Sequence, residues 1–216
     1  MIEANTIYFD FDGTLHNTMK IYKSALDDGV KFLKNLGIEP KNLSPETYHT
    51  WLGYNAGEMW KKVLPDADDE IRKKVKILVG KKMQENLNEG KGTLYDGVDE
   101  TLLELKKRNK TLVFLSNART SYYETVKKVF KLEKYFDDFL TSEAFKEIPK
   151  EEIIKRTMKK YKRNYIVVGD RFFDIQGGIK NDLDTIFCNY GFGEKKEGKE
   201  ASARIDDIRE LLEIIE

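Results

Sequence analysis

The chain has 216 residues, of which 40% are hydrophobic and 35% charged, and its 38 Lys and Arg residues balance its 38 Asp and Glu residues. This length allows one sizeable core, or a core with a small satellite domain, so a disordered chain is excluded. Because the charges balance, we expect neither nucleic acid nor an anionic membrane as the chief partner, although a local positive pocket for a small phosphate ester needs no global excess.

Strand and helix signals alternate along most of the chain. The run Ile7 to Phe9 is β-branched and aromatic and ends in turn-forming residues, which predicts a strand followed by a loop. Further apolar runs predict strands at residues 111–115, 139–141, 165–168 and 185–188, and apolar periodicity predicts helices at 97–108, 119–130, 150–161, 173–181 and 205–215. This alternation predicts an α/β fold, a parallel sheet covered by helices on each side, with ligands beyond the carboxyl ends of the strands.

Residues 16–90 break this alternation. Apolar side chains recur there at helical spacing in two long stretches, and no strand signal lies between them. We therefore expect an inserted all-helical domain of three or four helices, with hinges near residues 15–18 and 89–92. The core would then consist of residues 1–15 and 91–216.

The single cysteine, Cys188, has no internal disulfide partner and closes an apolar run that is typical of a buried strand. The N-terminus carries no basic segment followed by an apolar run, and 18 consecutive apolar residues occur nowhere. We therefore expect a cytoplasmic protein without a signal peptide or a membrane span.

Two aspartates follow the first predicted strand. Asp10 and Asp12 bracket one residue, and Gly13 lets the backbone fold back so that amide groups can approach an anion. Acidic pairs of this kind also occur as turn residues and helix caps. The pair by itself therefore leaves a structural and a chemical interpretation open.

Three further groups favour the chemical interpretation. Ser116 and Asn117 end the second long strand, Lys150 opens a helix, and Asp170 and Asp174 follow a third strand. Together with the acidic pair they supply a nucleophile, oxygen ligands for a hard cation, a hydroxyl group and an ammonium group. Phosphoryl transfer needs such charge neutralisation and positioning more than it needs covalent machinery.

These motifs resemble the haloacid dehalogenase superfamily, in particular its phosphoglycolate-phosphatase-like and β-phosphoglucomutase-like branch. The matching segments are Asp10-Phe11-Asp12-Gly13-Thr14, Gly169-Asp170-Arg171-Phe172-Phe173-Asp174 and, after the last strand, Tyr190-Gly191-Phe192-Gly193. The resemblance spans nearly the whole chain. It implies a Rossmann-like three-layer core, Mg²⁺ as the cofactor and a cap function for the helical insertion.

The resemblance also implies roles for the matching residues. Asp10 would attack phosphorus, and Asp12 would protonate the leaving oxygen and later deprotonate water. Mg²⁺ would be bound by the carboxylates of Asp10 and Asp170, by the backbone carbonyl of Asp12, and by Asp174 directly or through water. Ser116 and nearby amides would donate to the phosphoryl oxygens.

The resemblance also implies a positively charged group and further substrate contacts at the site. Lys150 would pair with the nucleophile and the phosphoryl group, although Lys146 stays open as an alternative because the usual prolines of the motif are absent. The further substrate contacts expected are Gly13, Thr14, Asn117, Ala118 and Arg171.

Residue 12 indicates the type of chemistry. An acid there suits an alkoxide leaving group, which needs a proton, whereas a halide needs none. We therefore predict a Mg²⁺-dependent phosphatase of small phosphomonoesters, as a monomer or weak homodimer. His16 and His49 are expected to be ordinary polar residues, since this mechanism needs no histidine. Three alternatives stay open: a phosphosugar mutase with the same aspartyl-phosphate, a receiver-like signalling module, and an inactive binding protein on this scaffold.

Overall fold

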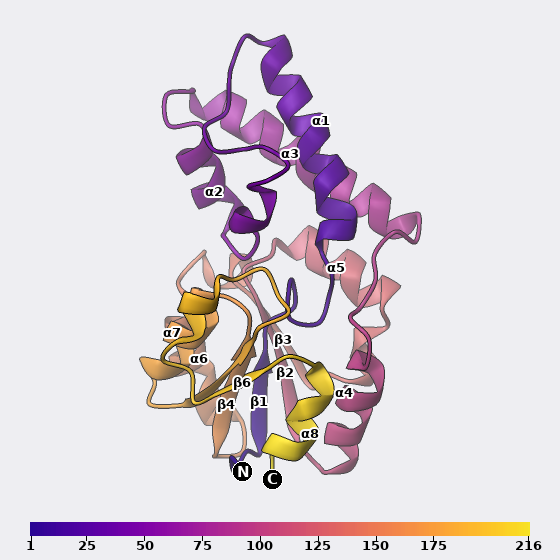
Figure 1. Ribbon diagram of the computed structural model, residues 1–216, viewed down its shortest axis with the longest axis vertical. Helices are drawn as coiled ribbons and strands as arrows, with labels where there is room; N and C mark the ends of the chain where they lie inside the picture. Colours follow the sequence, from indigo (N-terminus) through magenta and orange to yellow (C-terminus); the bar gives the residue numbers. More distant parts are fainter.

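The computed structural model describes residues 1–216 and contains one six-stranded parallel sheet (Figure 1). Its strands are β1 (Thr6–Phe9), β2 (Thr111–Ser116), β3 (Asp138–Thr141), β4 (Tyr165–Gly169), β5 (Asp184–Cys188) and β6 (Ala203–Ile205). They lie in the order β3-β2-β1-β4-β5-β6. Central β1 pairs with β2 on one side and with β4 on the other, so that Phe9 lies opposite both Phe114 and Val168. The residues that follow these three strands therefore emerge side by side.

Helices cover both faces of this sheet. They are α4 (Val98–Lys107), α5 (Thr120–Val129), α6 (Lys150–Thr157), α7 (Phe172–Ile179) and α8 (Leu211–Ile214). On one face, Tyr8 and Val167 pack in a cluster with Ile153 and Ile154 of α6. The opposite face, which includes Phe114, belongs to a cluster of 26 buried residues to which α4, α5 and α8 contribute. The α/β prediction with a Rossmann-like three-layer core is confirmed.

The helix predicted for residues 205–215 is wrong in its first part. Residues 203–205 form β6, in which Ile205 pairs with Cys188 of β5 and is fully buried. Helical structure begins only after Asp207, whose extended backbone and side chain cap a 3₁₀ turn by accepting a hydrogen bond from the Arg209 amide. A three-residue strand carries too short an apolar pattern to be recognised, and sheet pairing outweighs its local preference.

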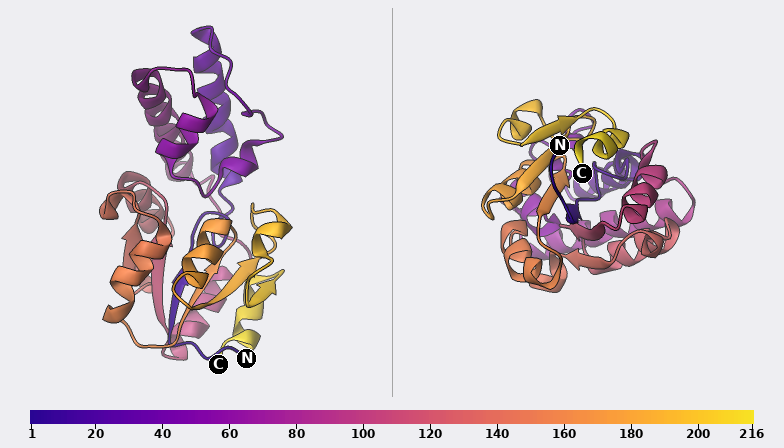
Figure 2. Two further views of the ribbon diagram at one scale, coloured as in Figure 1. Left: turned by 90° about the vertical axis from the view of Figure 1, so that its left-hand side faces the viewer. Right: turned by 90° about the horizontal axis from the view of Figure 1, so that it is seen from below.

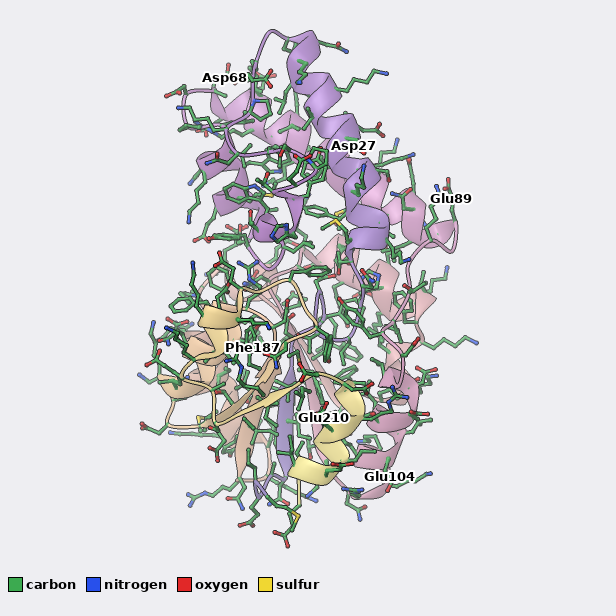
Figure 3. The ribbon with its side chains drawn as sticks, viewed as in Figure 1. Asp27, Asp68, Glu89, Glu104, Phe187 and Glu210 are labelled. Atoms are coloured by element: carbon green, nitrogen blue, oxygen red, sulfur yellow. The ribbon has the colours of Figure 1, made fainter.

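The segment between β1 and α4 is helical. Its helices are α1 (Met19–Asn35), α2 (Ala56–Val63) and α3 (Asp69–Asn88), with a 3₁₀ turn at Tyr48–Trp51. Asp68 caps α3 by accepting from the Ile71 amide at 2.8 Å, and its carboxylate is exposed (Figure 3). Gly29 lets α1 and α3 approach closely, since a Cβ at this position would lie 2.7 Å from Val79.

The helical segment has an apolar cluster of its own. It comprises 13 buried residues, including Leu26, Trp60 and Val75. The segment stacks on the carboxyl ends of the strands, and both chain termini lie at the opposite end of the molecule (Figures 1 and 2). The space between the segment and the sheet therefore adjoins the residues expected to carry chemistry. None of the helices combines the length and the apolar composition that a transmembrane span would need.

Candidate active site

Three buried aspartates meet at the carboxyl edge of the sheet. Asp10 directly follows β1 and donates its amide to the Val168 carbonyl at 2.9 Å, Asp170 directly follows β4, and Asp174 lies in the first turn of α7. One carboxylate oxygen from each of the three lies within 4.8 Å of the others, and none of these residues is more than 5% exposed. The structure thus brings together Asp10 and Asp174, which are 164 residues apart in the sequence.

Lys150 supplies the positive charge in this cluster. It is the first residue of α6, is only 4% exposed, and its Nζ lies 2.5 Å from Oδ1 of Asp10 and 2.5 Å from Oδ1 of Asp174. Lys146, the alternative left open by the sequence, lies in a turn with a φ of 58° and is exposed to solvent. Of the two lysines, only Lys150 contacts the aspartates.

The electrostatics of the cluster favour a bound cation. Burial raises the pKa of Asp10 well above its ordinary value, although Lys150 opposes this shift. Burial, assisted by the charge of Asp174, raises the pKa of Asp170 to about 7, against the opposing effect of the Phe192 amide. Three carboxylates therefore face one ammonium group. Because hard divalent cations prefer such oxygen ligands, these residues fit a divalent metal ion.

The loop after Asp10 wraps closely around this cluster. Gly13 has a φ of 98°, and a Cβ there would lie 2.3 Å from Oδ2 of Asp170, so only glycine fits. Thr14 directs its hydroxyl at two of the aspartates, 3.2 Å from Oδ1 of Asp170 and 3.4 Å from Oδ2 of Asp10. Both loop residues expected at the site therefore contact the acidic cluster or pass directly beside it.

Asp12 directs its side chain away from the cluster. Its Oδ1 accepts hydrogen bonds from the Tyr122 hydroxyl at 2.6 Å and from the Thr18 hydroxyl at 2.7 Å. His16, which is fully buried, places Nδ1 3.3 Å from the same oxygen, and its ring stacks on Phe11. The carboxylate of Asp12 is thus held outside the three-aspartate group, where it can serve a proton transfer.

Sequence reasoning missed these contacts to Asp12. Tyr122 is the third residue of α5, and the only available signal was its place in the first turn of the helix that follows Ser116. Burial raises the pKa of Tyr122 well above its ordinary value, so its hydroxyl is a hydrogen-bond donor at neutral pH. His16 was expected to be an ordinary polar residue, but it is packed next to a predicted catalytic acid.

The end of β2 supplies a hydroxyl and a turn. Ser116 is 2% exposed, and its Oγ accepts from the Ala118 amide at 3.1 Å. Ser116, Asn117 and Ala118 all line the cavity that also contains Asp10. The side chain of Asn117, however, donates to the Gly53 carbonyl of the helical segment at 2.9 Å.

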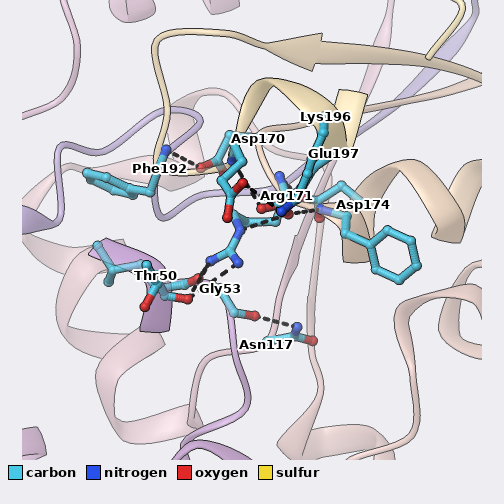
Figure 4. Close-up of polar contacts among 12 residues, drawn as sticks. Thr50, Gly53, Asn117, Asp170, Arg171, Asp174, Phe192, Lys196 and Glu197 are labelled. Atoms are coloured by element: carbon cyan, nitrogen blue, oxygen red, sulfur yellow. Dashed lines mark hydrogen bonds and ion pairs between the residues drawn. The ribbon is translucent and has the colours of Figure 1, made fainter. Parts of the chain in front are cut away.

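Arg171 also contacts the helical segment (Figure 4). Its guanidinium donates to the carbonyls of Leu52 and Thr50, and its Nε lies 3.1 Å from Oε2 of Glu197. The side chain of Arg171 does not line the cavity that contains Asp10. Arg171 and Asn117 therefore fasten the loop around residue 52 to the core, which sequence reasoning had not foreseen.

The parallel sheet ends in a lysine-paired aspartate, a group of carboxylates that could hold a cation and a separate acid, and this arrangement suits an enzyme that handles phosphoryl groups. Comparison with known proteins specifies the class. Residues 7–188 match the sequence model of the haloacid dehalogenase-like hydrolases, and the chain belongs to this family. It is an enzyme, a phosphatase of that family.

Similar proteins cover almost the full length of this chain. The pyrophosphatase PpaX of Bacillus cereus (strain Q1) is 25% identical over 221 residues, which span 99% of this chain and 97% of PpaX. A 5'-nucleotidase of Pseudomonas aeruginosa is 23% identical over 206 residues, 88% of this chain and 85% of that protein. The crystal structure of a predicted phosphoglycolate phosphatase from Haemophilus somnus superposes with a TM-score of 0.84 at 22% identity, covering 98% of this chain and 97% of that one. This likeness shows that the two folds agree.

Proposed function

We propose that this phosphatase hydrolyses a small phosphomonoester with Mg²⁺ and that Asp10 is its nucleophile. The observation that supports this most directly is the position of Lys150, whose Nζ lies 2.5 Å from Asp10 inside a buried group of three carboxylates. An ammonium group placed there offsets the repulsion between an anionic nucleophile and an anionic phosphoryl group.

The reaction has two steps. In the first, the Asp10 carboxylate attacks phosphorus, the bond to the leaving oxygen breaks with its electron pair, and Asp12 donates a proton to that oxygen. In the second, Asp12 removes a proton from water, which attacks the phosphorus of the aspartyl-phosphate and restores Asp10. The separate hydrogen bonds of Asp12 support this role, since they keep its carboxylate out of the cation cluster.

The cation would be held by the carboxylates of Asp10, Asp170 and Asp174 and by the Asp12 backbone carbonyl. When bound, it neutralises charge on the phosphoryl oxygens and keeps the nucleophile ionised. The raised pKa of Asp10 makes this second effect important, because burial alone favours the protonated acid. Ser116 and the amides near Ala118 would donate to the phosphoryl oxygens, and the loop at Gly13 and Thr14 would shape their pocket.

The helical segment, residues 16–90, would act as a cap over this site. Arg171 and Asn117 bind backbone carbonyls of its loop near residue 52, which supports a closed arrangement rather than direct contact of these side chains with substrate. A cap that excludes water strengthens the electrostatic interactions within the site. No observation specifically favours the mutase alternative.

Phosphate release from a panel of esters, with and without Mg²⁺, tests the proposal. Asp10→Asn should lower turnover by about a thousandfold or more, about 4 kcal/mol of barrier, because it removes the attacking anion. Asp28→Asn, at an exposed position on α1, is the matched control and should have the wild-type rate. Retained activity in Asp10→Asn would refute the assignment of the nucleophile. Formation of an isomeric sugar phosphate would instead indicate a mutase.

A further inference from the structure

The cavity above Asp10 extends far into the helical segment. Its volume is about 390 Å³, its floor contains Asp10, Asp12 and Ser116, and its walls come from α2, α3 and the loop before α2. Pockets for ligands the size of drugs and cofactors have volumes of about 300–1,000 Å³. The cavity therefore has room for a leaving group that is larger than a two-carbon acid.

The walls of this cavity are mainly aromatic and aliphatic. Trp51 and Tyr54 are half-buried and pack against each other with ring centroids 5.7 Å apart. Tyr122 forms the wall on the side of the core. Ile77 of α3 also lines the cavity and is 48% exposed, which makes it one of five large hydrophobic side chains exposed in the chain.

The polar atoms of three aromatic side chains in these walls already have partners within the protein. The Trp51 Nε1 donates to the Asn42 carbonyl at 2.8 Å, the Tyr22 hydroxyl donates to the Met59 sulfur, and the Tyr122 hydroxyl donates to Asp12. These residues offer a ligand the faces of their rings and few free donors. Hydroxyl groups of a sugar, or the oxygens of pyrophosphate, would gain no hydrogen bond from these three side chains in exchange for their hydration.

One cation on the wall lacks a partner. Lys76 of α3 is half-buried and lines the cavity without an ion pair, whereas Lys74 pairs with Glu70 at 3.0 Å and Lys81 lies 3.9 Å from Glu85. An unpaired ammonium group in an apolar wall is suited to an oxygen acceptor on the ligand.

We propose that the leaving group of the substrate carries a flat, largely apolar ring with an oxygen acceptor, which stacks on the aromatic wall and meets Lys76. The inference rests on the proposed function and specifies its substrate class. A nucleobase and an aromatic alcohol with an oxygen substituent on its ring share this chemistry. Stacking on aromatic side chains tolerates both, since every such ring offers a π face.

Matched pairs of esters test the ring in the full-length protein with saturating Mg²⁺. Uridine 5'-monophosphate and ribose 5-phosphate have the same leaving oxygen and differ in the base. The second pair, 3-methoxybenzyl phosphate and ethyl phosphate, differs in an oxygen-bearing ring without a sugar. We expect kcat/KM to be about tenfold or more higher for the ring-bearing member. A preference confined to the first pair would identify a nucleobase, and one confined to the second pair an aromatic alcohol; either result supports the inference.

Two variants connect this preference with the cavity. Ile77→Ser should reduce the ring preference in the favoured pair at least about fivefold, because it removes apolar wall area. Leu103→Ser is the matched control, since Leu103 is 43% exposed on α4 outside the cavity, and the preference should be unchanged. Asp10-dependent hydrolysis of ribose 5-phosphate or pyrophosphate, together with no preference for the ring-bearing member of either pair, would overturn this inference. The proposed function would then still stand. Absence of Asp10-dependent release from every ester would overturn the proposed function as well.

Discussion

Tyr122 donates its phenolic hydrogen to Oδ1 of Asp12 at 2.6 Å, across 110 residues of sequence. Since Thr18 donates to the same oxygen, Oδ1 is fully engaged, while Oδ2 of Asp12 has no hydrogen-bond partner in the chain. The arrangement fixes the carboxylate in one orientation and leaves one oxygen for proton transfer. Tyr122 is therefore a positioning residue for the proposed acid.

Tyr122→Phe should lower kcat/KM by an amount that depends on the leaving group of the ester. For alkyl phosphates, which need a proton on the leaving oxygen, we expect kcat/KM to fall roughly tenfold, about 1.4 kcal/mol. For p-nitrophenyl phosphate, which leaves without that proton, the decrease should be much smaller. An equal loss for both esters would indicate a general structural effect instead of a positioning role.

Lys150→Met should nearly abolish activity, whereas Lys146→Met should not affect it. The first variant removes the ammonium group 2.5 Å from Asp10 and leaves buried carboxylates without their counter-charge, at a cost of about 3–5 kcal/mol in stability as well. Lys146 is exposed and serves as the control. Thermal unfolding and phosphate release measure the two effects separately. Normal turnover in Lys150→Met would show that this lysine has no part in catalysis.

Ser116→Ala should lower kcat on the order of 10²-fold by removal of one preorganised donor. The hydroxyl is buried at the floor of the cavity, where a lost hydrogen bond to an anion is not replaced by water. Steady-state kinetics with one ester measure this effect. A wild-type rate would place the phosphoryl group elsewhere in the cavity.

Stability without metal should decline as the pH rises from about 4 to about 7. Asp170 has an ordinary pKa near 4 when unfolded and about 7 when folded, so the folded state binds more protons in this range and loses stability as they dissociate. Mg²⁺ should reverse the trend and raise Tm more at pH 8 than at pH 5, because it binds the ionised carboxylates. Scanning calorimetry with EDTA and with Mg²⁺ measures both. Asp170→Asn should flatten the dependence of metal-free stability on pH. If stability declines in this variant as it does in the wild type, the decline does not come from Asp170.

The local pattern of the sequence was sufficient to predict the core of the fold and the positions of the acidic residues. Apolar runs located five of the six strands, and turn residues marked where Asp10 and Asp170 follow them. Since parallel strands end at one edge of a sheet, these positions implied a shared site. The sixth strand was missed because Ala203–Ile205 has only three residues, and its pairing with β5 provides most of its stability.

The amino-acid sequence by itself determined the alternation of strands and helices, the inserted helical segment and the positions of the acids, because each depends on neighbours within a few turns of chain. Only the tertiary structure decided that Lys150 rather than Lys146 contacts Asp10, that Tyr122 holds Asp12, and that Arg171 binds the helical segment. These contacts join residues more than 100 positions apart. Their partners are fixed by the packing of whole elements, and no local preference encodes which side chains will meet.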